Sequence, residues 1–264
     1  MTSGGMDASQ RGTTKAALEA QGLKLSWDGA HVVAEDINLI VRPSEVVCLV
    51  GRSGCGKTTI LHALAGLTQP VAGRVLLAGE DVTGKPGHVS YMLQKDLLLQ
   101  HLTIVDNACL PLVLAGVPRA EARARAAELF AQFGLEGTQE MWPSQLSGGM
   151  RQRAAFLRTY LMGNDVALLD EPFSALDAIT RQELRTWYVH MAAELGIASL
   201  VITHDVDEAV SLAARILVLS GKPAEGKPSH IVGEVEVRRP AGGEDFSLTH
   251  EYVDCKREVM ELLI

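Results

Sequence analysis

Cysteine and long apolar runs are both scarce in this sequence. The 264 residues contain four cysteines, with no CxxC pair and no histidine spacing typical of zinc sites, so we expect reduced thiols. The most apolar stretch, residues 109–117, is far shorter than the roughly 18 residues of a membrane-spanning helix and contains Pro111 and Gly116. Any function at a membrane therefore requires a partner that spans it.

Positive charge is also in deficit. Lysine and arginine number 24 against 32 aspartates and glutamates, a formal net charge of −8, so we expect no nucleic-acid partner bound through a basic face. An anionic ligand would need a local site. With 47% apolar and 21% charged residues the composition is that of an ordinary globular protein.

The composition also suggests how the chain is divided. Residues 1–14 are polar and rich in Gly, Ser and Thr, without the apolar centre of an export signal, and we expect a mobile tail over 1–17. One folded domain is expected over 18–221, with a helical insertion at about 95–162. Residues 222–264 are expected to form a short C-terminal extension, β-like at 232–237 and helical at 252–263.

The order of the predicted elements indicates an α/β fold with a mixed, largely parallel β core. Strand patterns at 18–27 and 31–41, on either side of an Asp-Gly turn, indicate an antiparallel β region at the start. Short apolar strands are then expected at 45–50, 166–170 and 199–203, with a β-like stretch at 73–82. Helices are expected from 57 to about 66 and at 119–133, 148–162, 179–195 and 206–214. Buried strands alternating with helices predict crossover connections.

The segment GRSGCGKTT, residues 51–59, fits the phosphate-binding pattern G-x-x-x-x-G-K-[ST] between a strand and a helix. Gly51 and Gly56 let backbone N–H groups face phosphates, Lys57 reaches the outer phosphates, and the Thr58 hydroxyl binds Mg²⁺. Thr59 is a secondary phosphate contact or a cap. An ordinary glycine turn is the alternative, but it does not require this strand-loop-helix context.

Two carboxylates end the strand at 166–170. In a protein with a phosphate-binding loop, Asp170 is expected to orient Mg²⁺, and the adjacent Glu171 to polarise the water that attacks the γ-phosphate. A helix-start acidic residue is the alternative for Glu171. These motifs alone predict an ATPase without saying what hydrolysis drives.

Over about residues 18–220, the sequence resembles the ATP-binding subunits of ABC transporters. The resemblance is carried, in order, by Trp27, GRSGCGKT, Gln94, LSGGM at 146–150, LLDEP, SALD at 174–177 and His204. It implies the fold of a P-loop ABC cassette, with ATP and Mg²⁺ as cofactors.

The resemblance also implies a role for each matched residue. Trp27 would stack on adenine, or else be a packed core aromatic, and the whole loop from Gly51 through Arg52, Ser53, Gly54 and Cys55 to Thr59 would hold phosphates. Gln94 would contact Mg²⁺ or the attacking water, and His204 the γ-phosphate. In a head-to-tail homodimer, the partner's phosphates would meet a set of four residues: Ser147, Gly148, Gly149 and Asp177.

The stretches 91–112 and 202–220 resemble importers of the nitrate, sulfonate and taurine type, a group that includes thiamine-precursor uptake. This implies a peripheral subunit on the cytoplasmic face of the inner membrane, working with transmembrane permease subunits and, indirectly, a solute-binding protein. Where that group commonly has Pro-Trp, this chain has Gln100 and His101. The alternative is a soluble ABC-type ATPase or a regulatory nucleotide-binding module that is not coupled to transport.

Overall fold

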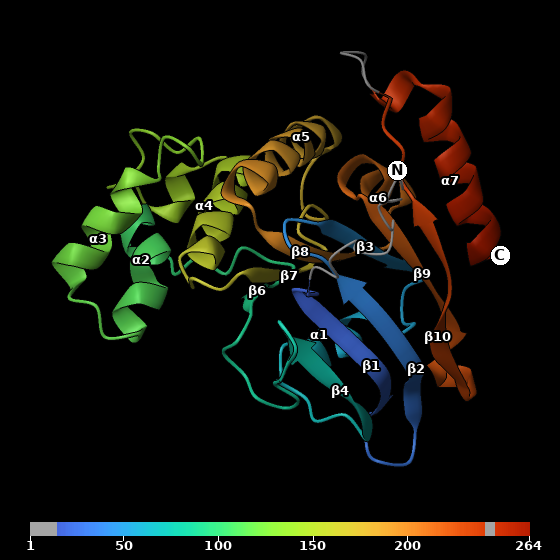
Figure 1. Ribbon diagram of the computed structural model, residues 1–264. Coiled ribbons are helices and arrows are strands. Elements are labelled where there is room, and N and C mark those ends of the chain that lie inside the picture. The colour runs from blue at the N-terminus through green and yellow to red at the C-terminus, as the bar shows by residue number, and fades with distance from the viewer. Residues whose placement is uncertain (1–14, 241–245) are drawn as a thin grey trace, which may run out of the picture.

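A computed structural model describes residues 15–240 and 246–264, so most of the tail expected over 1–17 lies outside the described residues. Its strands form one sheet of ten in the order β5-β4-β1-β2-β10-β9-β3-β8-β7-β6. Figure 1 shows this sheet on one side of the molecule, with helices α2 and α3 held away from it.

The parallel part of the sheet places four strand ends on one edge. Strand β3 (Val46–Gly51) pairs in parallel with β8 (Ala198–Thr203) and β9 (Arg215–Lys222). Strand β7 (Val166–Asp170) pairs in parallel with β8 and with β6 (Ser90–Met92). Because parallel strands share direction, the segments that follow β3, β6, β7 and β8 lie at the same edge.

An antiparallel region flanks this core, as the sequence predicts. Strand β1 (Leu18–Ser26) pairs with β2 (Val32–Val41) and with β4 (Ala72–Leu77). The single β-like stretch expected at 73–82 is instead split into β4 and β5 (Glu80–Asp81), because Ala78 and Gly79 have φ of 47° and 86° and make a turn. Both residues of that turn occupy the left-handed region, which a continuous strand cannot.

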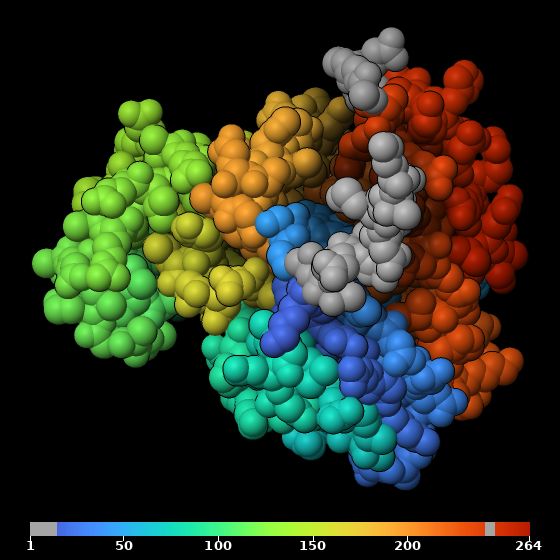
Figure 2. All heavy atoms as spheres, viewed as in Figure 1, coloured from blue at the N-terminus to red at the C-terminus, as the bar shows by residue number. Residues whose placement is uncertain are grey.

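The helices are α1 (Lys57–Leu64), α2 (Ile104–Leu114), α3 (Arg119–Glu128), α4 (Gly148–Tyr160), α5 (Ala178–Leu195), α6 (Val206–Leu212) and α7 (His250–Leu263). Short 3-10 turns occur at Pro143–Gln145, Pro223–Glu225 and Phe246–Leu248. Figure 2 shows α2 and α3 as a lobe beside the main body, on the far side of α4. No helix among residues 15–240 and 246–264 is both long and apolar enough to cross a membrane.

The segment after residue 221 is part of the sheet. Strand β10 (Lys227–Glu236) lies between β9, with which it pairs antiparallel, and β2, which it meets at Ser229 and Ala34. Helix α7 packs on these strands, and Leu262 fills the space beside Gly233. The extension expected over 222–264 therefore begins inside the fold and completes the link between the two parts of the sheet.

Candidate functional site

Glycine is required at two places in the loop between β3 and α1. Gly56, which caps the N-terminus of α1, has φ 92°, and a Cβ there would lie 2.7 Å from Cγ1 of Val33. At Gly51 a Cβ would lie 2.7 Å from the carbonyl oxygen of Leu219 on the neighbouring strand. Neither position has room for a side chain, so no side chain at these two positions covers the backbone groups of the loop.

The lysine of this loop is folded back onto its own backbone. Lys57 is 6% exposed, and its Nζ donates hydrogen bonds to the carbonyl oxygens of Gly51 (2.7 Å) and Arg52 (3.1 Å). Residues 52–54, Arg52, Ser53 and Gly54, are exposed, whereas Thr59 is half-buried. The buried ammonium therefore has neutral oxygens as partners, which an incoming anion can replace with a charge-assisted contact.

Cys55 points into the core rather than toward solvent. Its side chain is 2% exposed, and burial raises the pKa of its thiol above the ordinary value. A thiol held in this way is a small packing group and not a reactive nucleophile.

Asp170 ends β7 next to the loop. It is 8% exposed, burial raises its pKa, and the adjacent Glu171 carboxylate adds to the rise. The Thr58 hydroxyl beside Asp170 acts in the opposite direction and lowers this pKa. An alcohol and a buried carboxylate are thus brought together from α1 and β7, a pair of oxygen ligands suited to Mg²⁺.

Three of the predicted residues meet at the shared strand edge. The two carboxylate oxygens of Glu171 contact Nε2 of Gln94 at 3.2 Å and Nδ1 of His204 at 2.9 Å. The backbone of Glu171 has φ 43°, and its N–H donates to the carbonyl oxygen of Ile202 on β8. Such a conformation is uncommon outside glycine and aims the side chain across the edge of the sheet.

Ser174 belongs to the same cluster, although we had not singled it out as a site residue. Its hydroxyl accepts from Nε2 of Gln94 (3.3 Å) and donates to the carbonyl oxygen of Glu171 (2.9 Å). The feature of the sequence that could have identified Ser174 is its position in the loop directly after Asp170 and Glu171. Tyr91 is a second omission: it lies beside Asp170, and burial followed by the Asp170 charge raises the pKa of its phenol.

The segment LSGGM, residues 146–150, leads into the start of α4. Ser147 caps α4 by accepting from the backbone N–H of Met150 (3.3 Å), and Asp177 caps α5 by accepting from that of Thr180 (3.1 Å). A Cβ at Gly148 would face the side chain of Leu176, and a Cβ at Gly149 would face that of Thr180. Of the four residues expected to act across a dimer, Ser147 and Asp177 are thus exposed at helix N-termini, whereas Gly149 is buried beside Thr180.

Trp27 follows β1 and is not a core aromatic. Its side chain is 60% exposed, and its backbone N–H donates to the carbonyl oxygen of His31 across the β1–β2 turn. The packed-core alternative therefore does not describe this residue.

Comparisons with known proteins agree with this geometry. The family model for ABC transporters matches residues 34–174. The formylaminopyrimidine import ATP-binding protein ThiZ of Halalkalibacterium halodurans is 37% identical, over 80% of this chain and 83% of its own length. The nitrate import ATP-binding protein NrtC of Synechococcus elongatus is 36% identical over 90% of this chain but 36% of its own length.

Among solved structures, the dimeric ATP-binding cassette MJ0796 in a post-hydrolysis state, bound to ADP and Pi, is similar with a TM-score of 0.68 and 26% identity. The match covers 84% of this chain and 100% of that one. The fold, the loop between β3 and α1 and these similarities lead to one conclusion. This chain belongs to the ATP-binding proteins of ABC transporters, which bind ATP and hydrolyse it to drive transport.

Proposed function

We propose that the protein is the ATPase subunit of an ABC importer and energises uptake of a small solute through a separate transmembrane permease. The observation that carries the proposal is the contact of Glu171 with both Gln94 and His204, at the strand edge that also bears the phosphate-binding loop. A regulatory module that only binds nucleotide has no need of such a cluster.

In this proposal the cluster acts on water and on the γ-phosphate. The Glu171 carboxylate accepts a proton from the attacking water, and His204 donates a hydrogen bond to the γ-phosphate. Gln94 holds the carboxylate and presents its amide oxygen to the water. Lys57 and the loop N–H groups from Gly51 to Thr59 hold the phosphates, so that catalysis is positioning and charge stabilisation rather than covalent chemistry.

The residues present also fit Mg²⁺. The Thr58 hydroxyl lies beside the Asp170 carboxylate, and Gln94, which contacts the adjacent Glu171, supplies a neutral amide oxygen. A bound Mg²⁺ would neutralise phosphate charge and would compensate the charge of the buried Asp170 carboxylate.

The active form is proposed to be a homodimer. Ser147, Gly148 and Gly149 present the N-terminus of α4 and Asp177 that of α5, so they offer N–H groups and a hydroxyl to a second nucleotide. Trp27, exposed at the β1–β2 turn, is proposed to stack on the adenine. MJ0796, itself dimeric, supports this arrangement.

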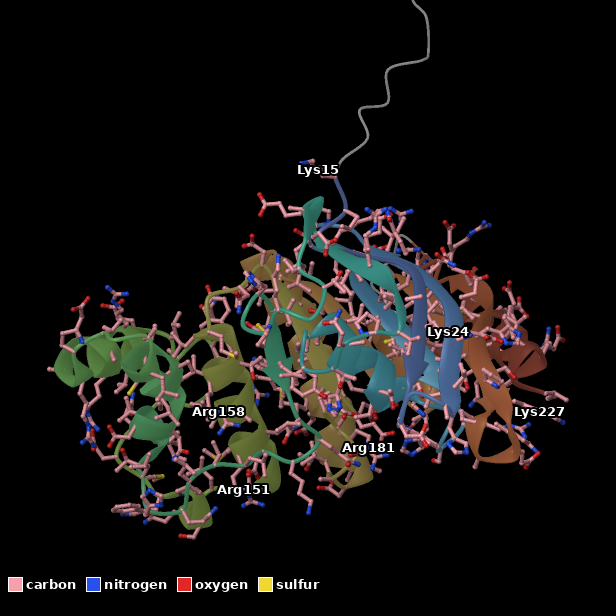
Figure 3. All side chains as sticks on the ribbon, turned by 90° about the horizontal axis from the view of Figure 1, so that it is seen from below. Lys15, Lys24, Arg151, Arg158, Arg181 and Lys227 are labelled. Atoms are coloured by element: carbon pink, nitrogen blue, oxygen red, sulfur yellow. The ribbon has the colours of Figure 1, made fainter. Side chains whose placement is uncertain are left out.

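A groove of about 440 Å³ is proposed to receive the permease. It lies between the loop after β6, the start of α4 and the segment before α5, and Gln100 is among the residues that line it. Leu97, 50% exposed, lies in the same loop. Arg151 and Arg158 of α4 (Figure 3) hold the loop by donating to the Asp96 carboxylate and the Leu97 carbonyl oxygen. This contact would place the subunit peripherally on the cytoplasmic face of the inner membrane.

The solute is proposed only as a class, of the nitrate, sulfonate, taurine or thiamine-precursor type. ThiZ and NrtC differ by name in what they import, yet they are about equally similar to this chain. A solute-binding protein would act indirectly, through the permease. The competing hypothesis remains an ABC-type ATPase that works without a permease.

Two substitutions test the chemistry. Glu171→Gln should keep ATP binding but lower steady-state hydrolysis by a factor on the order of 10² or more, the contribution of a positioned general base. Glu128→Gln, at an exposed position of α3, controls for the loss of one carboxylate. Lys57→Ala should weaken ATP binding itself, because the ammonium contacts phosphate. Normal hydrolysis by Glu171→Gln would remove it from the base role.

Coupling to transport has a separate test. The tagged subunit is recovered from detergent-solubilised native membranes, and its companions are identified by mass spectrometry. A polytopic membrane protein together with a solute-binding protein would support an importer. Recovery of ribosomal or DNA-repair proteins with no permease would refute transport and leave the ATPase chemistry intact.

A further inference from the structure

Unsatisfied polar atoms gather where α5 packs on α6. Among the described residues, Nε of Arg181, Nε of Arg185 and Oε1 of Glu208 are buried without a hydrogen-bond partner. The two arginines are one turn apart on α5, and Glu208 lies in the first turn of α6. Buried polar groups without partners are few in native proteins, so such a cluster marks a place with more than a packing role.

Arg181 (Figure 3) connects two loops that are distant in the sequence. Its Nη2 donates to the carbonyl oxygen of Leu176 at 2.7 Å, and its Nη1 lies 3.8 Å from Oδ2 of Asp205. Leu176 directly precedes Asp177, and Asp205 directly follows His204. A single guanidinium therefore spans the segment proposed to face the partner subunit and the segment proposed to face the γ-phosphate.

Asp205 transmits this contact into the start of α6. Its Oδ1 accepts from the backbone N–H of Glu208 (3.1 Å) as the helix cap, while Oδ2 faces Arg181. Its own N–H donates to the Thr203 hydroxyl at 3.0 Å. The residue next to His204 thus contacts Thr203, the N-terminus of α6 and Arg181.

Glu208 places a second acidic side chain beside the Asp205 carboxylate. Glu208 is 3% exposed and lies close to Asp205, so two carboxylates meet at the start of α6 with little solvent. The charges of Arg185 and Arg181 lower the pKa of Glu208, against the larger raising effects of burial and of the Asp205 charge. The planar guanidinium of Arg181 can contact a carbonyl and a carboxylate together, which an ammonium group cannot do as well.

We propose that Arg181 is a positioning residue that couples the Asp177 segment to His204. The inference rests on the proposed function. Arg181 touches neither nucleotide nor water; it acts through the carbonyl of Leu176 and the carboxylate of Asp205. A displacement of Asp177 at the dimer interface then displaces His204. Closure of the dimer and alignment of Glu171, Gln94 and His204 therefore occur together.

The experiment compares Arg181→Met with Arg181→Lys and Arg185→Met in the full chain. Steady-state hydrolysis is measured against MgATP, equilibrium ATP affinity by fluorescence, and folding by circular dichroism. We expect Arg181→Met to lower kcat by ~10-fold to ~100-fold, the scale of a small displacement of a catalytic group, with little change in ATP affinity. Arg181→Lys should recover part of the loss.

Arg185→Met is the matched control because it also removes from α5 an arginine with a buried Nε, while no hydrogen bond or ion pair joins Arg185 to Leu176 or Asp205 within the described residues. It should keep most of the wild-type kcat. An equal loss of kcat in both methionine variants, in step with their thermal stability, would overturn the positioning role. So would an unchanged kcat in a folded Arg181→Met.

A double variant tests the path. If Arg181 acts through the Asp177 segment, adding Asp177→Ala to Arg181→Met should lower kcat little further, because both changes cut the same link. Multiplicative losses would contradict the inference. Absence of hydrolysis in the wild-type chain would instead be a failure of the proposed function, so the two failures are distinguishable.

Discussion

Replacing Glu208 with glutamine should change how the stability of the protein depends on pH. Burial of the Glu208 carboxyl raises its pKa to about 7, and the charge of Asp205 adds to this, against smaller opposing effects from Thr203, Arg185 and Arg181. A group whose pKa is raised on folding stabilises the native state while it is protonated. The stabilisation is complete below the unfolded pKa and is lost as pH rises through the folded value.

The size of the effect follows from the two pKa values. With an unfolded value of 4.5 and a folded value of about 7, the contribution of Glu208 to the free energy of unfolding falls by about 1.4 kcal/mol between about pH 6 and about pH 8.5. Glu208→Gln cannot ionise, so its stability relative to wild type should rise with pH by that amount. For an m-value of about 2–3 kcal/mol/M, the urea midpoint difference changes by about 0.5–0.7 M.

The assay is urea unfolding followed by far-UV circular dichroism, at several pH values within this window and at constant ionic strength. Glu183→Gln, at an exposed position of α5, controls for the removal of one carboxylate. A difference between Glu208→Gln and wild type that stays constant with pH, or that grows toward low pH, would refute the reasoning.

Three further predictions follow from buried or constrained groups. Arg215→Met should lower the free energy of unfolding by about 3 kcal/mol and the melting temperature by about 6–12 °C, because Glu45 loses the guanidinium that lies 2.6 Å from its carboxylate. Calorimetry should find that the double variant with Glu45→Gln recovers much of the lost stability. Gly56→Ala should lower the free energy of unfolding by roughly 1–2 kcal/mol from the left-handed backbone alone. Through the clash with Val33 it should also weaken ATP binding, measured by titration calorimetry, and a wild-type affinity would contradict the requirement for glycine. All four cysteines are buried with raised thiol pKa values, so Ellman's reagent should react slowly with the native protein and fully in guanidinium; rapid native reaction would contradict their burial.

Residues 104–114 show where prediction from sequence stopped. These residues fall within the helical insertion expected at about 95–162, but no individual helix was placed at 104–114. Pro111 normally interrupts a helix, yet the segment forms α2. The cause is tertiary: Ile104 and Ala108 are fully buried, and the side-chain amide of Asn107 donates to the carbonyl oxygens of Leu99, Leu102 and Thr103. Packing and a satisfied buried amide outweigh the loss of one helical hydrogen bond.

Strand β9 was likewise not predicted, although it carries Arg215. This side chain is 6% exposed and joins Glu45, Glu234 and the carbonyl oxygen of Ile40, which come from three separate parts of the chain. In the sequence it is one arginine among many. Its partners become neighbours only when β10 enters the sheet between β2 and β9.

The sequence by itself determined the phosphate-binding loop, the pair Asp170 and Glu171 and the alternation of strands and helices, because these depend on residues close together in the chain. Tertiary structure alone decided that Gln94 and His204 both contact Glu171, and that the segment after residue 221 belongs to the sheet. It also decided that polar side-chain atoms of α5 and α6 are buried without hydrogen-bond partners. Local patterns fix a loop or a helix, whereas contacts between distant segments depend on strand order and side-chain packing, which short-range periodicity does not encode.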